Sequence, residues 1–182
     1  MLNGLITDAN GNSVVNSNGK IINNTDLWTQ YATTNTLKSY GGVKGVLALG
    51  VDSSGVATRK LLTDRDTGGN TTGTLLNQIG VDYLTTTTDS SRGYLLSLLG
   101  FVLDPTPANL PKDTSTLISS SELRQIGAIM HSSPVLLTNS GTITTSSSGS
   151  VDTTNRNDYI LFGTTQGLLH VVDATTGQEK FA

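Results

Sequence analysis

The sequence predicts a mainly β protein with a few short helices, in which residues 125–182 form the first blade of a β-propeller and residues 1–124 form the segment before it. The first observation is composition: of 182 residues only 35% are apolar and 14% charged, and Thr, Ser, Asn and Gly fill much of the remainder. β-Branched Thr suits strands, whereas Asn and Gly suit turns. The second observation is that short apolar runs alternate with turn residues. The third is a succession of four such runs at the C-terminal end, which is the pattern of one blade. No second copy of the pattern follows, so we expect a fragment in which no propeller closes.

Residues 1–24 alternate apolar pairs with Asn-Gly dipeptides. Asn-Gly between β-prone runs is a strong hairpin signal and favours two or three short strands, and the alternative is an arm whose turns never dock. After these residues, Thr25 or Asp26 can cap a helix that runs to about Ser39. Trp28 lies on the apolar side of this helix and is expected to anchor a core.

The next stretch favours a hairpin and then a helix. Residues 45–63 predict the hairpin, with Val46–Leu49 and Val56–Leu62 as its arms around an Asp-Ser-Ser-Gly turn. Leu75–Leu84 is predicted as a short helix, and Thr85–Thr88 follows it as a polar connector.

An apolar run and a proline-rich loop come next. Tyr94–Leu103 is continuously apolar apart from single small residues, and periodicity leaves open whether it is a buried helix or a strand. Three prolines make residues 104–113 a loop. Ser119–Met130 is predicted as a short helix, because either of two serines can cap it and Glu122 would lie in its first turn.

The blade itself is predicted as four strands. Three are expected at Pro134–Thr138, Tyr159–Gly163 and Leu168–Asp173, and Gln178–Phe181 is expected to begin the fourth. Between the first two strands lies a Ser/Thr/Gly-rich tract, residues 140–157, with too little apolar surface to order itself. We expect it to be a long surface loop.

Composition also excludes several classes of function. The net charge is -3 and no basic run occurs, so a nucleic-acid partner or an anionic membrane surface is not expected. The absence of cysteine excludes disulfides, zinc fingers and thiol catalysis within the chain. No apolar run is long enough to span a bilayer. Met1–Leu5 does not begin a signal peptide. If the protein is exported, we expect its signal upstream in a longer parent.

His131 and His170 are the only two histidines. A metal or general-base role is conceivable for either of them. A zinc site or a catalytic triad needs further acids or histidines at suitable positions, and the sequence offers no clear set. We therefore expect His131 to hold a turn and His170 to pack in a strand, and we expect no catalytic, cofactor-binding or metal-binding residue and no enzyme activity.

Three acidic turns are candidate sites. Asp173, with Thr175, Thr176 and Gly177, is expected to form a structural turn in which Asp accepts backbone N–H bonds and Gly supplies a positive φ. Asp64–Asn70 has the acid spacing of a calcium loop, but glycine and leucine occupy positions that need ligands. Asp8–Asn12 fails in the same way. Both are interpreted as polar loops.

Two ordered motifs carry a resemblance to a known family. Gln125–Val135 reads Gln-Ile-Gly-Ala-Ile-Met-His-Ser-Ser-Pro-Val, and Tyr159–Ala182 contains Gly-Thr-Thr-Gln-Gly-Leu-Leu-His-Val-Val-Asp-Ala-Thr-Thr-Gly-Gln-Glu-Lys-Phe-Ala. Together they resemble the entry into the C-terminal β-propeller of PilC/PilY-type type IV pilus tip adhesin and biogenesis proteins. Ala128 and Gln166 stand where the family usually has Asp. Two earlier segments, 59–63 and 81–84, also resemble the stretch before that propeller.

The resemblance covers about a third of the chain and implies a function. It implies a non-enzymatic pilus biogenesis factor and tip adhesin that is exported to the cell surface, the pilus tip or the outer membrane. Its expected partners are minor pilins and host or abiotic surfaces, and twitching motility would depend on it. Calcium is implied elsewhere in the full-length protein, but no cofactor in this stretch. One alternative is a quinoprotein-like propeller, either an enzyme or an outer-membrane assembly scaffold, because such propellers share the core of the second motif. Another is a stand-alone Thr/Ser-rich adhesin with no propeller, in which residues 125–182 would not form four antiparallel strands.

Overall fold

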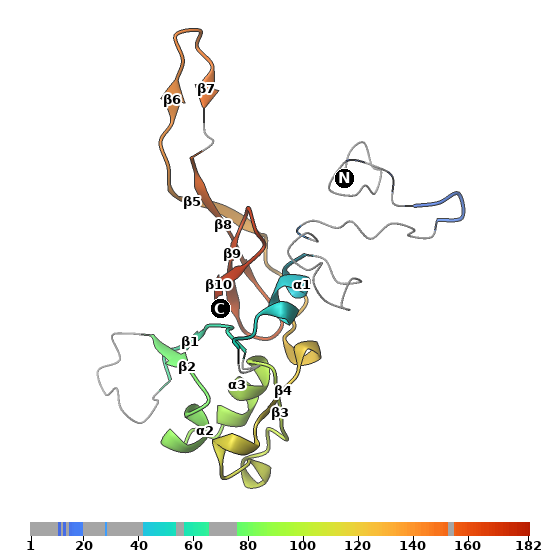
Figure 1. The fold of residues 1–182 in the computed structure, drawn as a ribbon, viewed down its shortest axis with the longest axis vertical. Helices are drawn as coiled ribbons and strands as arrows, with labels where there is room; N and C mark the ends of the chain where they lie inside the picture. The colour runs from blue at the N-terminus through green and yellow to red at the C-terminus, as the bar shows by residue number, and fades with distance from the viewer. Residues whose placement is uncertain are drawn as a thin grey trace.

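The computed structural model describes a mainly β protein with a few short helices, arranged as one four-stranded sheet and several two-stranded ones (Figure 1). The residues that it describes are 11, 13, 15–19, 28, 42–53, 57–65, 76–152 and 155–182. The strands predicted within residues 1–24 and the helix predicted from residue 25 to Ser39 therefore lie almost wholly outside the described residues. Within the predicted helix Trp28 is the one described residue, and it is buried, as predicted.

The first described helix replaces a predicted strand. α1 spans Gly42–Leu49, so the prediction that Val46–Leu49 forms a hairpin arm is wrong. The reason is a tertiary contact: the Arg124 guanidinium donates hydrogen bonds to the carbonyl oxygens of Leu47 and Ala48 at the C-terminal end of the helix. A helix leaves its last carbonyls without partners, and a cation at that end stabilises it. After the helix, an isolated antiparallel bridge joins Val51 to Ala57, and Thr58 N donates to the carbonyl oxygen of Gly50 at 3.0 Å.

The hairpin partner of the following strand lies further along the chain than expected. β1 (Leu61–Thr63) pairs antiparallel with β2 (Asn77–Ile79). The predicted helix over Leu75–Leu84 is therefore wrong for most of its length, and only α2 (Tyr83–Thr86) is helical. Ile79 is 2% exposed in its strand, so burial against the core outweighs the weak local helical preference.

The apolar run that periodicity left open is a helix followed by a strand. α3 covers Arg92–Leu98, and β3 (Phe101–Val102) follows after a turn at Gly100, whose φ is +100°. β3 pairs with β4 (Ile118–Ser119). Between these strands the proline-rich stretch forms irregular chain and two 3-10 turns, η2 (Pro107–Asn109) and η3 (Thr114–Thr116).

The predicted helix Ser119–Met130 is wrong, because only one 3-10 turn, η4 (Ser121–Leu123), forms there. Two competing interactions explain the difference. Ser119 belongs to β4, and the backbone N–H groups of Gly127 and Ala128 donate to the side chains of Gln166 and Thr165. These N–H groups are thus used across the fold rather than along a helix.

The four predicted C-terminal strands form one antiparallel sheet. They are β5 (Val135–Ser140), β8 (Asn157–Gly163), β9 (Leu169–Asp173) and β10 (Glu179–Phe181). Their order across the sheet is β10-β9-β8-β5, so each strand lies beside its neighbour in sequence within this sheet. In the register, Leu161 lies opposite Val135 on one side and opposite Val171 on the other.

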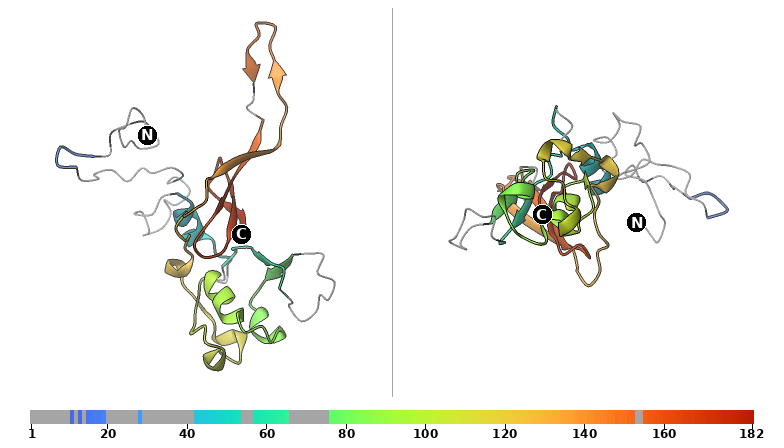
Figure 2. Two further views of the ribbon diagram at one scale, coloured as in Figure 1. Left: turned by 180° about the vertical axis from the view of Figure 1, so that it is seen from behind. Right: turned by 90° about the horizontal axis from the view of Figure 1, so that it is seen from below.

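A two-stranded arm joins β5 to β8. β6 (Thr144–Thr145) and β7 (Val151–Asp152) pair within the Ser/Thr/Gly-rich tract. Figures 1 and 2 show the arm projecting away from the rest of the described structure. Every described residue from Gly141 to Asp152 is exposed. The tract therefore lies on the surface as expected, in the form of a short hairpin.

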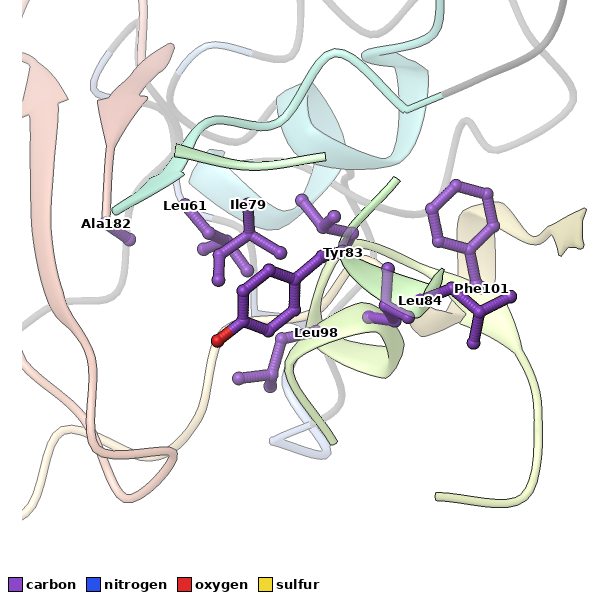
Figure 3. Packing of buried hydrophobic residues seen from close by; sticks show 9 residues of the cluster. Leu61, Ile79, Tyr83, Leu84, Leu98, Phe101 and Ala182 are labelled. Atoms are coloured by element: carbon purple, nitrogen blue, oxygen red, sulfur yellow. The ribbon is translucent and has the colours of Figure 1, made fainter. Parts of the chain in front are cut away.

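The main core lies where the small sheets and helices meet the end of the four-stranded sheet. Figure 3 shows Tyr83 at the centre of this cluster, with Leu61 and Ala182 next to each other at one end. The buried members of the cluster are Leu61, Ile79, Tyr83, Leu84, Leu96, Leu98, Leu99, Phe101 and Ala182. Leu168 packs against the same cluster, so the start of β9 and the end of β10 are both fixed to it.

Candidate functional site

A buried cluster of charged side chains joins the four-stranded sheet to the segment before β1. Glu179 lies at its centre, with its side chain 1% exposed. Arg59 donates from Nε to Oε2 of Glu179 at 2.7 Å and from Nη2 to Oε1 at 3.1 Å. Nδ1 of His170 lies 2.6 Å from the same Oε1. The carboxylate thus has a two-pronged ion pair on one side and an imidazole on the other.

Strand register explains why these side chains meet. Glu179 lies opposite Val172, and Val172 is two residues after His170 on β9. Opposite residues, and residues two apart on one strand, share a sheet face. Glu179 and His170 therefore point to the same side of the sheet, and Arg59 reaches that side from the segment before β1.

The outer atoms of the cluster are satisfied as well. Nη1 of Arg59 donates to the carbonyl oxygens of Leu98, at 2.7 Å, and Gln125, at 3.3 Å. Nε2 of His170 lies 3.0 Å from Oγ1 of Thr164, and the imidazole stacks on the ring of Phe162 at a centroid distance of 5.0 Å. Buried polar groups that are fully paired in this way fix one arrangement of the chain.

The balance of burial and pairing sets the charge of Glu179. Burial on its own raises the pKa of a carboxyl group, but the hydrogen bonds from His170 and Arg59 and the charge of Arg59 outweigh it and lower the pKa of Glu179 below its ordinary value. The carboxylate therefore stays ionised at neutral pH.

In this cluster a carboxylate contacts an imidazole, and the imidazole contacts a hydroxyl. In hydrolases the same order of groups activates a nucleophile. Here the same carboxylate is bound by Arg59, and the imidazole of His170 is 0% exposed. The small cavity beside the cluster, about 70 Å³, borders Arg59 and Glu179 and not Thr164. The arrangement fits a structural lock between two parts of the chain.

A second buried cation lies close to this cluster. Arg124 is 3% exposed and donates to the end of α1 and to Oγ of Ser119. Burial lowers the pKa of its guanidinium. Leu47, whose carbonyl oxygen accepts from Arg124, also lines the 70 Å³ cavity beside Arg59 and Glu179.

The two histidines have different environments. His170 packs inside the sheet, in line with the sequence interpretation, and it also bonds to Glu179. His131 is exposed, with a φ of +56°. The turn there is held by its neighbour: Gly163 N donates to Oγ of Ser132 at 2.9 Å. Ser132, and not His131, therefore holds this turn, and the prediction for His131 is wrong.

The turn after β9 has the structure predicted for it. Oδ1 of Asp173 accepts hydrogen bonds from the backbone N–H groups of Thr175 and Thr176, at 2.9 and 3.0 Å. Gly177 has a φ of +70°, and a Cβ added to it would lie 2.5 Å from ring atoms of Trp28. The indole thus lies directly on the glycine, which only a residue without a side chain allows.

An ion pair lies at the start of the candidate calcium loop, between the half-exposed side chain of Arg65 and the largely buried side chain of Asp89. Arg65 donates to both oxygens of Asp89, and Tyr83 Oη donates to Oδ2 at 2.8 Å. The hydrogen bonds from Arg65 hold the pKa of Asp89 well below its usual range. Burial and the Asp89 hydrogen bond raise the pKa of Tyr83 to about 12. Most of the candidate loop Asp64–Asn70, from Asp66 on, lies outside the described residues, as does nearly all of Asp8–Asn12.

Sequence reasoning did not find the partners of His170. Arg59 and Glu179 are 120 residues apart, and both lie in segments quoted for the family resemblance, yet neither was given a role. The position of Glu179, two residues after the turn glycine in a strand with a buried face, was the available signal. Nothing in the sequence around Arg59 indicates that it is buried in an ion pair, because its partner is known only from the fold.

The described residues bring together no group of three His, Asp or Glu side chains that could hold a metal ion. Within the same part of the chain, no helix has the length and apolar character that a bilayer crossing requires. No protein family, curated protein or solved structure matches this chain.

Proposed function

We propose that this chain is part of a non-enzymatic type IV pilus biogenesis factor and tip adhesin of the PilC/PilY type, with residues 125–182 as the first blade of its C-terminal propeller. The observation that carries the proposal is the four-stranded antiparallel sheet with the order β10-β9-β8-β5. A blade of a propeller is a meander of this kind.

The residues of the resemblance occupy structural positions in that sheet. Gln166 and Thr165, in the turn between β8 and β9, bind the backbone of Gly127 and Ala128. Asp173 and Gly177 make the next turn. The two motifs thus pack against each other, which is what a single conserved unit would require.

One face of the sheet also supports the proposal. Val135, Leu137 and Leu169 share this face by register and are 58%, 48% and 58% exposed. A sheet face with several exposed apolar side chains is suited to contact with another surface. In a propeller, that surface is the adjacent blade.

Genetic deletion tests the proposal. In a piliated bacterium that encodes the protein, removal of residues 135–182 should abolish surface pili or twitching, measured by electron microscopy and by the width of the twitching zone. Lys112→Ala, on an exposed loop, is the matched control and should leave both unchanged. Normal pili, twitching and surface attachment in the deletion strain would refute the proposal.

A cofactor titration separates the proposal from a quinoprotein-like propeller. An adhesin should bind neither a quinone nor a quinone with calcium, as measured by absorbance and calorimetry. Saturable quinone binding by the full-length protein would favour the quinoprotein-like alternative, which requires a pocket lined by several blades.

A further inference from the structure

The start of β1 pairs with the residue that follows β10. Ala182 N donates to the carbonyl oxygen of Lys60 at 3.0 Å, and Leu62 N donates to the carbonyl oxygen of Ala182 at 2.8 Å. Ala182 is thus hydrogen-bonded to the residues on both sides of Leu61, which is the pattern of a parallel strand pair. Figure 3 shows the side chains of Leu61 and Ala182 next to each other.

The side chains of this segment alternate between buried and exposed. Arg59 and Leu61 are 6% and 1% exposed, whereas Thr58 and Lys60 are exposed. Such a period of two is what a strand shows when one face packs on a protein surface. Arg59 enters the charge cluster around Glu179, and Leu61 enters the main core.

We propose that this edge of the C-terminal sheet is a strand-docking groove of the β-augmentation type, which the chain fills with its own residues 57–62. In β-augmentation, main-chain hydrogen bonds provide affinity, and pockets for alternate side chains provide specificity. Here the specificity is for arginine followed two residues later by leucine. The inference rests on contacts alone and does not depend on the proposed function.

The arginine pocket is selective because of its geometry. Nε and Nη2 meet both oxygens of Glu179, while Nη1 meets two backbone carbonyls. A lysine ammonium cannot reproduce this fork, and an apolar residue would leave Glu179 buried without its main partner. The groove therefore discriminates among extended segments by this one side chain.

A peptide-binding experiment tests the groove in the full chain. Arg59→Glu places a second carboxylate against Glu179 and should displace residues 57–62. A fluorescent peptide with the sequence of residues 57–63 should then bind this variant roughly tenfold more tightly than it binds the unaltered chain, in which the groove is filled. The same peptide with methionine in place of arginine should bind the variant no better than it binds the unaltered chain.

The matched control is Lys60→Glu, which makes the same charge change on an adjacent exposed residue and should bind no peptide. Equal binding of the arginine and methionine peptides to Arg59→Glu, or binding of neither, would overturn the proposal. Fluorescence of Trp28, the single tryptophan, reports whether the variant is folded.

Hydrogen exchange on the unaltered chain tests the docked strand directly and does not require Arg59→Glu to fold. The amides of Leu62 and Ala182 should be protected to within roughly tenfold of Val171 and Val172 in the centre of the sheet, because each donates to a partner strand. Unprotected amides at Leu62 and Ala182 beside a protected β9 would refute the docked strand.

Discussion

Glu179 is the buried carboxylate that balances the charge of Arg59. Its carboxylate accepts from Arg59 and lies in hydrogen-bond contact with His170, and its surroundings contain no second acid among the side chains that the structure joins to it. The next residue on β10, Lys180, pairs instead with Asp173 of β9 at 3.3 Å, and its side chain is partly exposed. Removing or protonating Glu179 would therefore leave a buried guanidinium without compensation.

Acid should weaken the fold through this residue. The pKa of Glu179 is lower in the folded chain than its ordinary 4.5, so its stabilising contribution is complete above that value and is lost as the pH falls through the folded pKa. We expect Glu179→Gln to lower the free energy of unfolding at pH 7 by about 3 kcal/mol. The difference between the two proteins should shrink as the pH is lowered below 4.5, in urea unfolding experiments at a series of pH values.

Asp89 makes this comparison necessary. Its pKa is also lowered, by Arg65 first of all, so the unaltered chain loses stability in acid through both residues. Only the difference between the unaltered chain and Glu179→Gln isolates the buried cluster. A difference that is constant from pH 7 to acid would contradict the assignment.

Gly177 offers a second prediction at this scale. Gly177→Ala must adopt a φ of +70° and place its Cβ 2.5 Å from the Trp28 ring. The backbone costs about 1–2 kcal/mol and the overpacking adds a similar amount. We expect a loss of about 2–4 kcal/mol in unfolding free energy, with a red shift of tryptophan emission.

Gly167→Ala is the matched control for that experiment. Gly167 has a similar φ of +76°, but a Cβ there would meet nothing within 4 Å. It should lose about 1–2 kcal/mol from the backbone alone and leave the emission of Trp28 unchanged. Identical emission spectra in both variants would mean that Trp28 does not lie on Gly177 in solution.

At the scale of elements, local sequence predicted the C-terminal sheet better than the rest. Tyr159–Gly163 and Leu168–Asp173 are apolar runs separated by a short turn, and such strands pair with their neighbours in sequence. The helices were predicted less well. α1 depends on Arg124, which is 77 residues away from Leu47 in the sequence. No local sequence pattern contains that contact.

The candidate site shows the same difference between local and long-range contacts. The Asp173 turn was predictable, because its hydrogen bonds lie within three residues. The Arg59–Glu179 pair was not, because it joins residues 120 apart. Sequence patterns identify turns and strand faces, whereas the partner of a buried charge is fixed only when distant segments pack together.

The arm between β5 and β8 should contribute little to stability. Its residues from Gly141 to Asp152 are exposed. The side chains of the ion pair at its base, Arg156 with Asp158 of β8, are 31% and 22% exposed, so the pair contributes at most about 1 kcal/mol. Replacing residues 141–156 with Asn-Gly should change the unfolding free energy by no more than about 1 kcal/mol in urea, because the shorter loop offsets the lost contacts. A loss of several kcal/mol would show that the arm packs against the body.

At the scale of the whole molecule, the sequence predicts a boundary between residues 124 and 125, yet several contacts cross it. Arg59 binds Glu179, Leu61 packs beside Ala182, and Trp28 lies on Gly177. Each contact joins a residue before the boundary to the stretch from residue 177 to the last residue. Parts that share buried ion pairs and core residues in this way are expected to unfold together.

Coincident unfolding is therefore the prediction for the whole chain. Trp28 fluorescence reports on the segment before the boundary where it meets the sheet, and far-ultraviolet circular dichroism reports on all strands and helices. We expect both signals to give the same urea midpoint, within about 0.2 M, and the same slope. The Glu179→Gln variant should shift both midpoints equally, because the cluster belongs to both parts. Two separate midpoints, with only the fluorescence transition moved by Glu179→Gln, would mean that residues 125–182 fold without the preceding segment and that the predicted boundary divides two independent units.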